Sequence, residues 1–269
     1  MTKRTSAAPS KKDQLELAVI ECLDELKHPS ARDAFIAQSK DPKYYGMDFS
    51  ERLSLILQAE VTKRKERRTE RLLKESKIDD KTVSVQNIVY SEERNANAVV
   101  IKELAKGRWL ENPGKDWIIV TGKTGTGKTF ISKCFLKQAI DKGYKGYYIR
   151  ANHLFDDLAL AREEHRITKF KESLNRYQVL LIDDFNFQSI TETVLEDFLD
   201  LLDDRYKKAF LIITSQFPLE EWYGYLQNNP SIVNKTRADA IMDRIINNSQ
   251  TVELKGPSMR EARRKSTTP

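Results

Sequence analysis

Residues 122–129 read GKTGTGKT, and residues 179–184 read VLLIDD. The first stretch matches the pattern G-x-x-x-x-G-K-[ST], and it lies between a short apolar segment, WIIV at 117–120, and a helical pattern that starts at Lys128. In this context the pattern predicts a phosphate-binding loop, because glycines let backbone N–H groups point at phosphate oxygens and a helix N-terminus adds partial positive charge. A plain glycine-rich turn is the weaker interpretation. The expected nucleotide-binding residues are Gly122, Thr124, Gly125, Thr126, Gly127, Lys128 and Thr129.

Two residues of this loop have specific expected roles, and VLLIDD supplies their acidic partners. The Lys128 ammonium reaches the β- and γ-phosphates of a nucleotide, and the Thr129 hydroxyl binds Mg²⁺. The apolar residues bury the strand and place Asp183 and Asp184 at its carboxyl end, where open parallel sheets bind ligands. We expect Asp183 to bind Mg²⁺ through water and Asp184 to orient and polarise an attacking water. Adjacent carboxylates alone are weak evidence, but together with the loop they indicate an Mg²⁺-dependent nucleotide site.

Outward from these motifs, short apolar strands alternate with helices. Strands are expected at 117–120, 146–151, 179–184, 209–215 and 251–255, and helices at 128–142, 153–161, 167–176, 191–206 and 236–247. This alternation predicts an α/β fold with a parallel sheet covered by helices on both faces.

The N-terminal part has a different pattern and predicts a small all-helical domain. Helices are expected at 13–27, from 30 to about 40, and from Asp48, a plausible N-cap with Glu51 three residues later. An apolar stripe in the last helix gives way to a basic segment. We therefore expect a disordered tail at 1–12, a helical DNA- or partner-binding domain at 13–80 with a linker around 78–86, an ATPase domain at 87–256 and a basic tail at 257–269.

Composition excludes several classes of protein. The 269 residues carry a net charge of +6 and are 39% hydrophobic, which is too apolar for a disordered chain. The apolar runs are too short to span a membrane, and no secretory signal is evident at the N-terminus. The two cysteines, Cys22 and Cys134, lie too far apart to suggest a disulfide framework or a metal cluster. We expect a soluble, cytoplasmic-type protein with no membrane partner.

The residues after the third strand favour nucleotide hydrolysis over phosphate transfer to a small acceptor. A small-molecule kinase needs an arginine-bearing lid and an acceptor pocket, and no segment suggests either. Gln216 follows the fourth strand, where a polar side chain can contact the γ-phosphate or the attacking water. Arg244 is a candidate arginine finger for an adjacent subunit, with Arg237 as the second choice. The alternative for Arg244 is a surface ion pair with a neighbour such as Asp243.

Several segments together resemble the IstB-type helper ATPases of insertion sequences, which are AAA+ proteins similar to the DnaC helicase loaders. The resemblance covers roughly residues 44–262, and its more specific parts are ITSQFPLEEW and ADAIMDRIINN. It rests on residues 44–68 (YYGMDFSERLSLILQAEVTKRKERR), 122–129, 182–185 (IDDF), 213–222, 238–248 and 252–260 (VELKGPSMR).

The resemblance implies a AAA+ core without the usual helical lid domain, ATP and Mg²⁺ as cofactors, and ATP-dependent homo-oligomerisation on double-stranded DNA. It further implies target-site selection and stimulation of a partner transposase. Gln216 corresponds to the first sensor and Arg244 to the finger, and Arg260 is a candidate for the second sensor. Asp184 stands where many AAA+ proteins have glutamate, and its side chain is shorter by one methylene, so we expect slow turnover.

Two basic clusters are expected to contact DNA phosphates without reading base sequence, although charge runs of this kind are often only solvated, salt-bridged helix faces. Aromatic residues are not interleaved with the first cluster, which weakly favours duplex over single-stranded DNA. A helicase loader acting on single strands and a plain P-loop phosphotransferase remain alternatives. The expected DNA-contacting residues are Lys63, Arg64, Arg67, Arg68 and Arg71 in the first cluster, and Arg162, Arg166, Lys169 and Lys171 in the second.

Overall fold

The computed structural model describes residues 10–80, 82–90, 98–186, 190–206, 208–256 and 258, apart from the side chain of Arg237. Two compact units make up the chain, Met1–Glu70 and Arg71–Pro269. The division falls inside helix α3 (Phe49–Glu75). Nearly all of the expected tails at 1–12 and 257–269 lies outside the described residues, and so does Arg260.

The first unit consists of helices, as the sequence predicts. Helix α1 (Lys11–Glu25) begins two residues earlier than expected, because Ser10 and Asp13 form a capping box. Helix α2 (Pro29–Lys40) has proline in its first turn, which explains the break before it. A short 3₁₀ helix, η1 (Pro42–Tyr44), leads to α3. The N-cap predicted for α3 is confirmed, since an Asp48 carboxylate oxygen accepts from the Ser50 N–H at 2.7 Å.

A buried carboxylate joins α2 to α3 within this unit. Glu60 of α3 is only 6% exposed. It accepts hydrogen bonds from the N–H groups of Ser30 (2.8 Å) and Ala31 (3.2 Å), at the open N-terminus of α2. Arg64, one turn further along α3, donates to the same carboxylate at 2.8 Å. Glu60 therefore satisfies helix-end donors that would otherwise be buried without partners.

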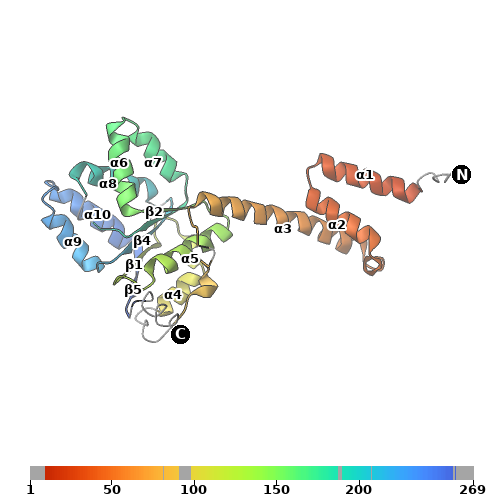
Figure 1. The fold of residues 1–269 in the computed structure, drawn as a ribbon, viewed down its shortest axis with the longest axis horizontal. Helices are drawn as coiled ribbons and strands as arrows, with labels where there is room; N and C mark the ends of the chain where they lie inside the picture. Colours follow the sequence, from red (N-terminus) through yellow and green to blue (C-terminus); the bar gives the residue numbers. More distant parts are fainter. Residues whose placement is uncertain are drawn as a thin grey trace, which may run out of the picture. The chain divides into compact units, whose positions relative to one another are not determined.

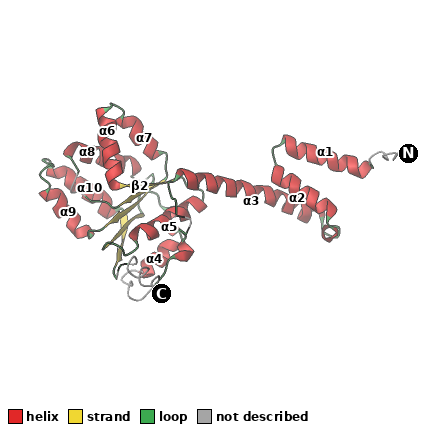
Figure 2. Cartoon of the chain, viewed as in Figure 1, coloured by secondary structure: helices red, strands yellow, loops and turns green. Residues whose placement is uncertain are grey.

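A five-stranded sheet with the order β2-β3-β4-β1-β5 forms the centre of the second unit, and each pair of neighbouring strands is parallel. The expected fold class is confirmed. Helices cover both faces of the sheet (Figures 1 and 2). The strands are β1 (Trp117–Gly122), β2 (Gly146–Arg150), β3 (Val179–Asp183), β4 (Phe210–Ser215) and β5 (Ser249–Leu254).

Alternating strand residues divide the core into two clusters, as the period of two requires. Ile119, Leu180 and Ile213 pack on one face, under the helices α6 to α10. Ile118, Leu181 and Ile212 pack on the other, under α4 and α5. These helices are α4 (Ala98–Ala105), α5 (Lys128–Asp141), α6 (Ala151–Glu163), α7 (Ile167–Asn175), α8 (Glu192–Arg205), α9 (Leu219–Asn228) and α10 (Lys235–Asn247).

The segment expected to be a linker, residues 78–86, is instead part of the second unit. Ile78, Val83 and Ile88 are each less than 10% exposed and belong to the core cluster under α5. A short 3₁₀ helix, η2 (Val85–Asn87), lies within this stretch, and a second, η4 (Arg108–Glu111), precedes β1. The expectation was wrong here because the few apolar residues of this segment are spaced too irregularly to show a strand or helix pattern.

No helix among the described residues is both long enough and apolar enough to cross a membrane.

We expect Glu60→Ala to destabilise the N-terminal helices by about 1 kcal/mol, the usual cost of losing a helix cap. Amide hydrogen exchange at Ser30 and Ala31 of the full chain measures this directly, and both amides should exchange faster. Glu66→Ala is the matched control, because Glu66 lies on the same helix and its ion pair with Lys63 is exposed. Equal exchange in the two variants would contradict the capping role.

Lowering the pH of the unaltered protein should also destabilise the N-terminal helices and speed amide exchange at Ser30 and Ala31. Burial raises the pKa of Glu60, but hydrogen bonds from Arg64, Ala31 and Ser30 outweigh it and leave the pKa below its ordinary value of 4.5. The contribution of Glu60 is therefore complete above pH 4.5 and is lost as the pH falls through the lowered value.

Candidate active site

The loop between β1 and α5 has the conformation that its glycines allow. Gly122, Gly125 and Gly127 have φ of 144°, 85° and 95°, a region that other residues rarely adopt. Space is also restricted. A Cβ on Gly122 would lie 2.3 Å from the carbonyl oxygen of Leu254, and one on Gly125 would lie 2.2 Å from the Ser258 hydroxyl. The loop is therefore fixed both by its own backbone and by the chain at and beyond the end of β5.

Lys128 occupies the first turn of α5 and is 6% exposed. Its ammonium donates to the carbonyl oxygens of Gly122 (2.7 Å) and Lys123 (3.0 Å). The hydroxyl of Thr126 donates to the same Lys123 carbonyl at 2.8 Å. A positive charge is thus held inside the loop, beside the N-terminus of a helix, which is an arrangement suited to phosphate.

Asp183, at the end of β3, is 1% exposed and receives hydrogen bonds from three hydroxyl groups. Thr129 donates to its two carboxylate oxygens at 2.9 and 3.1 Å, which joins the loop motif to the acidic motif as expected. Thr214 of β4 and Tyr148 of β2 (3.1 Å) are the other donors. A carboxylate beside a threonine hydroxyl is a set of oxygen donors that fits Mg²⁺.

Asp184 is exposed and has a φ of 54°, the left-handed region that aspartate tolerates better than most residues. Its N–H donates to the Thr214 hydroxyl at 2.9 Å. The turn directs the two adjacent carboxyl groups differently, so that Asp183 is buried while Asp184 lines an open pocket. Gln216 lines the same pocket and accepts a hydrogen bond from the Thr124 hydroxyl at 2.7 Å.

The pocket beside the loop has a volume of about 350 Å³, within the range of small-ligand sites. Its walls include Lys128, Thr129, Asp184 and Gln216. Four other lining residues, which the sequence analysis did not identify, come from the stretch taken as a linker and just after it. These are Asp80, Asn87, Ile88 and Val89.

Arg244 is not among the residues that line this pocket. Its side chain is 37% exposed, and its Nε donates to a carboxylate oxygen of Asp203 on α8 at 2.6 Å. The surface ion pair considered from the sequence is therefore present, with Asp203 as the partner instead of Asp243. The side chain of Arg237, the second candidate, lies outside the described residues.

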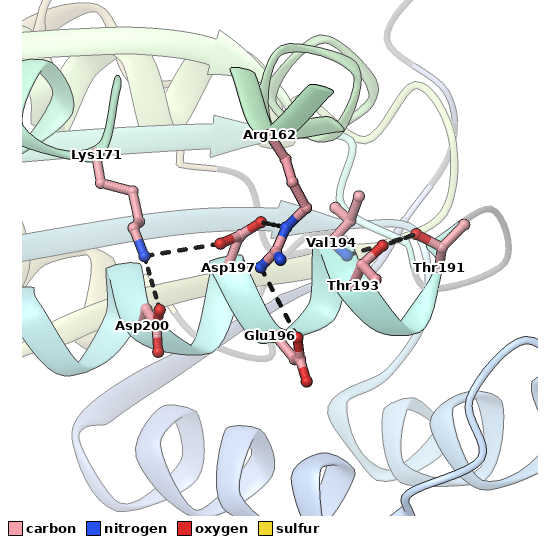
Figure 3. Close-up of polar contacts among 8 residues, drawn as sticks. All are labelled: Arg162, Lys171, Thr191, Thr193, Val194, Glu196, Asp197 and Asp200. Atoms are coloured by element: carbon pink, nitrogen blue, oxygen red, sulfur yellow. Dashed lines mark hydrogen bonds and ion pairs between the residues drawn. The ribbon is translucent and has the colours of Figure 1, made fainter. Parts of the chain in front are cut away.

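The second basic cluster is engaged with acidic residues of α8. Figure 3 shows Arg162 of α6 and Lys171 of α7 on either side of Asp197. The Arg162 Nε lies 2.6 Å from one oxygen of Asp197, and the Lys171 ammonium lies 3.7 Å from the other. Lys171 also lies 2.7 Å from Asp200, and Arg166 pairs with Glu164. Asp197 is 1% exposed, so this network holds three helices together. Lys169 is exposed.

The first basic cluster lies on α3, and its side chains are exposed. With 3.6 residues per turn, its basic residues fall on one side of the helix. Ion pairs with carboxylates on the same helix include those of Lys63 with Glu66, Arg64 with Glu60 and Arg71 with Glu75. These are ion pairs between neighbouring turns, and all but that of Glu60 are solvent-exposed. They leave the basic stripe accessible to a polyanion.

A family model described as IstB-like ATP binding protein matches residues 21–267. The chain belongs to the IstB-like ATP binding proteins. The resemblance stated from the sequence is thereby confirmed. A putative insertion sequence ATP-binding protein of Sinorhizobium fredii is 30% identical to this IstB-like chain over 219 residues, which is 81% of this chain and 86% of that one. The insertion sequence IS21 putative ATP-binding protein of Pseudomonas aeruginosa is 26% identical, covering 80% and 77%.

Solved structures show the same fold as this IstB-like protein at low identity. DnaI has a TM-score of 0.55 and 17% identity, over 64% of this chain and 91% of that one. AMPPCP-bound DnaA from Aquifex aeolicus has a TM-score of 0.53 and 18% identity, over 70% and 56%. The second unit therefore has the fold of AAA+ proteins.

Lys128→Ala should weaken ATP binding by roughly 10- to 100-fold, the effect of losing charged hydrogen bonds worth about 1.5–3 kcal/mol. Lys137→Ala is the matched control, since Lys137 lies on the same helix and pairs with Asp141 outside the pocket. Titration with a fluorescent ATP analogue measures both. Equal affinities in the two variants would show that the loop does not bind phosphate.

Proposed function

We propose that this chain is an Mg²⁺-dependent ATPase that regulates DNA transposition. It assembles on double-stranded DNA, selects target DNA and stimulates a partner transposase, and hydrolysis controls the assembly. The observation that carries the proposal is the contact of Thr129 with Asp183, which unites the phosphate loop and the acidic strand end in a chain whose relatives are named as insertion sequence ATP-binding proteins.

Each residue in and beside the pocket is proposed to have its own role in ATP hydrolysis. Loop N–H groups and Lys128 hold the phosphates. Thr129 and Asp183 would hold Mg²⁺, which would neutralise charge on the phosphate oxygens. Asp184 orients a water molecule and accepts its proton as the water oxygen bonds to the γ-phosphorus. The bond from that phosphorus to the bridging oxygen then breaks, giving ADP and phosphate. Gln216 is positioned by Thr124 to contact the γ-phosphate or this water.

The wall formed by Asn87, Ile88 and Val89 is proposed to receive the nucleotide base. Ile88 is 5% exposed and fixes this stretch to the core under α5. A flat, largely apolar base can pack on such a wall, while the polar side chains beside it supply hydrogen bonds.

Arg244 is proposed to complete the nucleotide site of an adjacent subunit. An arginine finger stabilises charge on the transferred phosphate and makes hydrolysis depend on assembly. Arg244 is partly exposed, and the exposed Asp203 is its partner. Such an ion pair contributes little to stability, so it can exchange for a phosphate of a neighbouring subunit.

Arg244→Ala should lower the rate of ATP hydrolysis on duplex DNA by about 10³-fold or more, the effect of losing a finger. Asp203→Asn is the matched control, because it breaks the same ion pair but leaves the guanidinium in place. Equal hydrolysis rates in these two variants would assign Arg244 a structural role only.

Particle mass in solution tests the assembly in the same samples. With Mg²⁺ and a slowly hydrolysed ATP analogue, the unaltered protein should form large particles on duplex DNA and not on a single strand of equal length. Assembly on single strands alone would favour a helicase loader, and a monomer in every condition would contradict the proposal.

The basic stripe on α3 is the proposed DNA contact, and the α6–α7 cluster is the weaker candidate because Arg162 and Lys171 already have buried or short-range partners. Contacts to phosphates alone give binding that is tolerant of sequence and steeply dependent on salt. The stripe extends over about 12 Å from Lys63 to Arg71, at 1.5 Å per residue. This length allows contacts with several consecutive phosphates.

Changing Arg67, Arg68 and Arg71 together to glutamine should weaken duplex binding and flatten the slope of log K against log[salt] by about 3, one for each phosphate contact. Arg64 is left unchanged because it supports Glu60. Arg166→Gln with Lys169→Gln is the control and should change the slope little. A larger change in the control would move the DNA contact to the α6–α7 cluster.

A further inference from the structure

Tyr148 is a residue of the site that no motif indicated. It lies on β2, at the edge of the sheet next to β3, and is half-buried. Its hydroxyl donates to an oxygen of Asp183 at 3.1 Å. The ammonium of Lys133, from α5, lies 4.1 Å from the centre of its ring.

The backbone of the same residue contacts the end of α3. The Tyr148 N–H donates to the carbonyl oxygen of Ser76 at 2.9 Å, and Ser76 directly follows the last residue of that helix. Leu72, in the last turn of α3, is 2% exposed and belongs to the core cluster against which Tyr148 packs. On the neighbouring position of β2, Lys77 lies over the ring of Tyr147 at 4.9 Å.

A single residue therefore joins the end of α3 to the carboxylate expected to hold Mg²⁺. We propose that Tyr148 is a positioning residue for Asp183, and that it transmits the position of the end of α3 to that carboxylate. The proposal rests on the proposed function of this site as a Mg²⁺–nucleotide site. Tyrosine suits such a role, because its rigid ring sets the direction of its hydroxyl once the backbone is fixed.

The three donors to Asp183 have different roles in this arrangement. Thr129 is itself an expected ligand of the ion, so its hydroxyl would serve the ion as well as Asp183 when the site is filled. Thr214 also accepts from the Asp184 N–H and is fixed by β4. Tyr148 is the donor whose strand is bonded to the end of α3. Changes at that end can thus alter the carboxylate without altering the phosphate loop.

Tyr148→Phe tests the proposal by removing one hydroxyl. Mn²⁺ binding in the presence of ADP, followed by electron paramagnetic resonance, should be about 10-fold weaker, as for other groups that orient metal ligands. Binding of a fluorescent ADP analogue without metal should be unchanged. Tyr144→Phe is the matched control, because Tyr144 is also half-buried and its hydroxyl donates to the Leu110 carbonyl at 3.1 Å, outside the site. It should change Mn²⁺ affinity less than twofold.

Two outcomes separate this proposal from the proposed function. If the unaltered protein binds Mn²⁺ with ADP and Tyr148→Phe binds it equally well, the positioning role is wrong and the proposed function stands. If the unaltered protein binds no Mn²⁺ with ADP, the metal site itself is wrong, and the role of Tyr148 is wrong with it.

Hydrogen exchange tests the link to α3. Addition of MgADP should slow exchange of the Tyr148 amide, which is bonded to Ser76, in the unaltered protein and in Tyr144→Phe but not in Tyr148→Phe. An unchanged amide in the unaltered protein would overturn the link.

Discussion

The buried carboxylate of Asp183 sets the requirements that the rest of the site must meet. A charge removed from water without partners costs several kcal/mol, on the order of the whole stability of a domain. Three hydroxyl groups offset this cost, and they come from α5, β2 and β4. Those elements meet around Asp183 only when β3 lies between β2 and β4 in a parallel sheet. The strand order of the sheet is therefore required for the hydrogen bonds that stabilise the Asp183 carboxylate in the site.

The phosphate loop depends on the other half of the sheet. β1 lies between β4 and β5, so its carboxyl end is bordered by Gln216 on one side and by Leu254 on the other. Gln216 contacts Thr124, and the Leu254 carbonyl leaves no room for a side chain on Gly122. Gly122 is thus required by the packing of β1 against β5 as well as by the phosphate-binding motif. The loop conformation is consequently built into the fold before any ligand binds.

Sequence patterns predicted the features that depend on residues close together in the chain. Strand periodicity and the loop motif identified the five strands, the phosphate loop and the acidic pair. The parts that were missed depend on contacts between residues distant in sequence. Tyr148 resembles any half-buried strand tyrosine until β3 is placed beside it, and Ile88 shows no pattern until α5 covers it. Arg162 looked like a free basic residue because its partner Asp197 lies on another helix. Helices α4 and α9 were not predicted.

Ion pairs between residues distant in sequence also determine which basic residues can contact a polyanion. Acidic residues of α8 neutralise Arg162 and Lys171, two basic residues contributed by α6 and α7. On α3, by contrast, the ion pairs are formed mainly between exposed neighbours on the helix itself, which water and salt screen effectively. A polyanion can displace such pairs at little cost, whereas separating Asp197 from its partners would leave a buried charge. Arg71 and Lys74 lie within five residues of Ser76, whose carbonyl binds Tyr148. If both proposals hold, a phosphate bound there would act on the last turn of α3 and, through the hydrogen bond between Ser76 and Tyr148, on the strand that carries Tyr148.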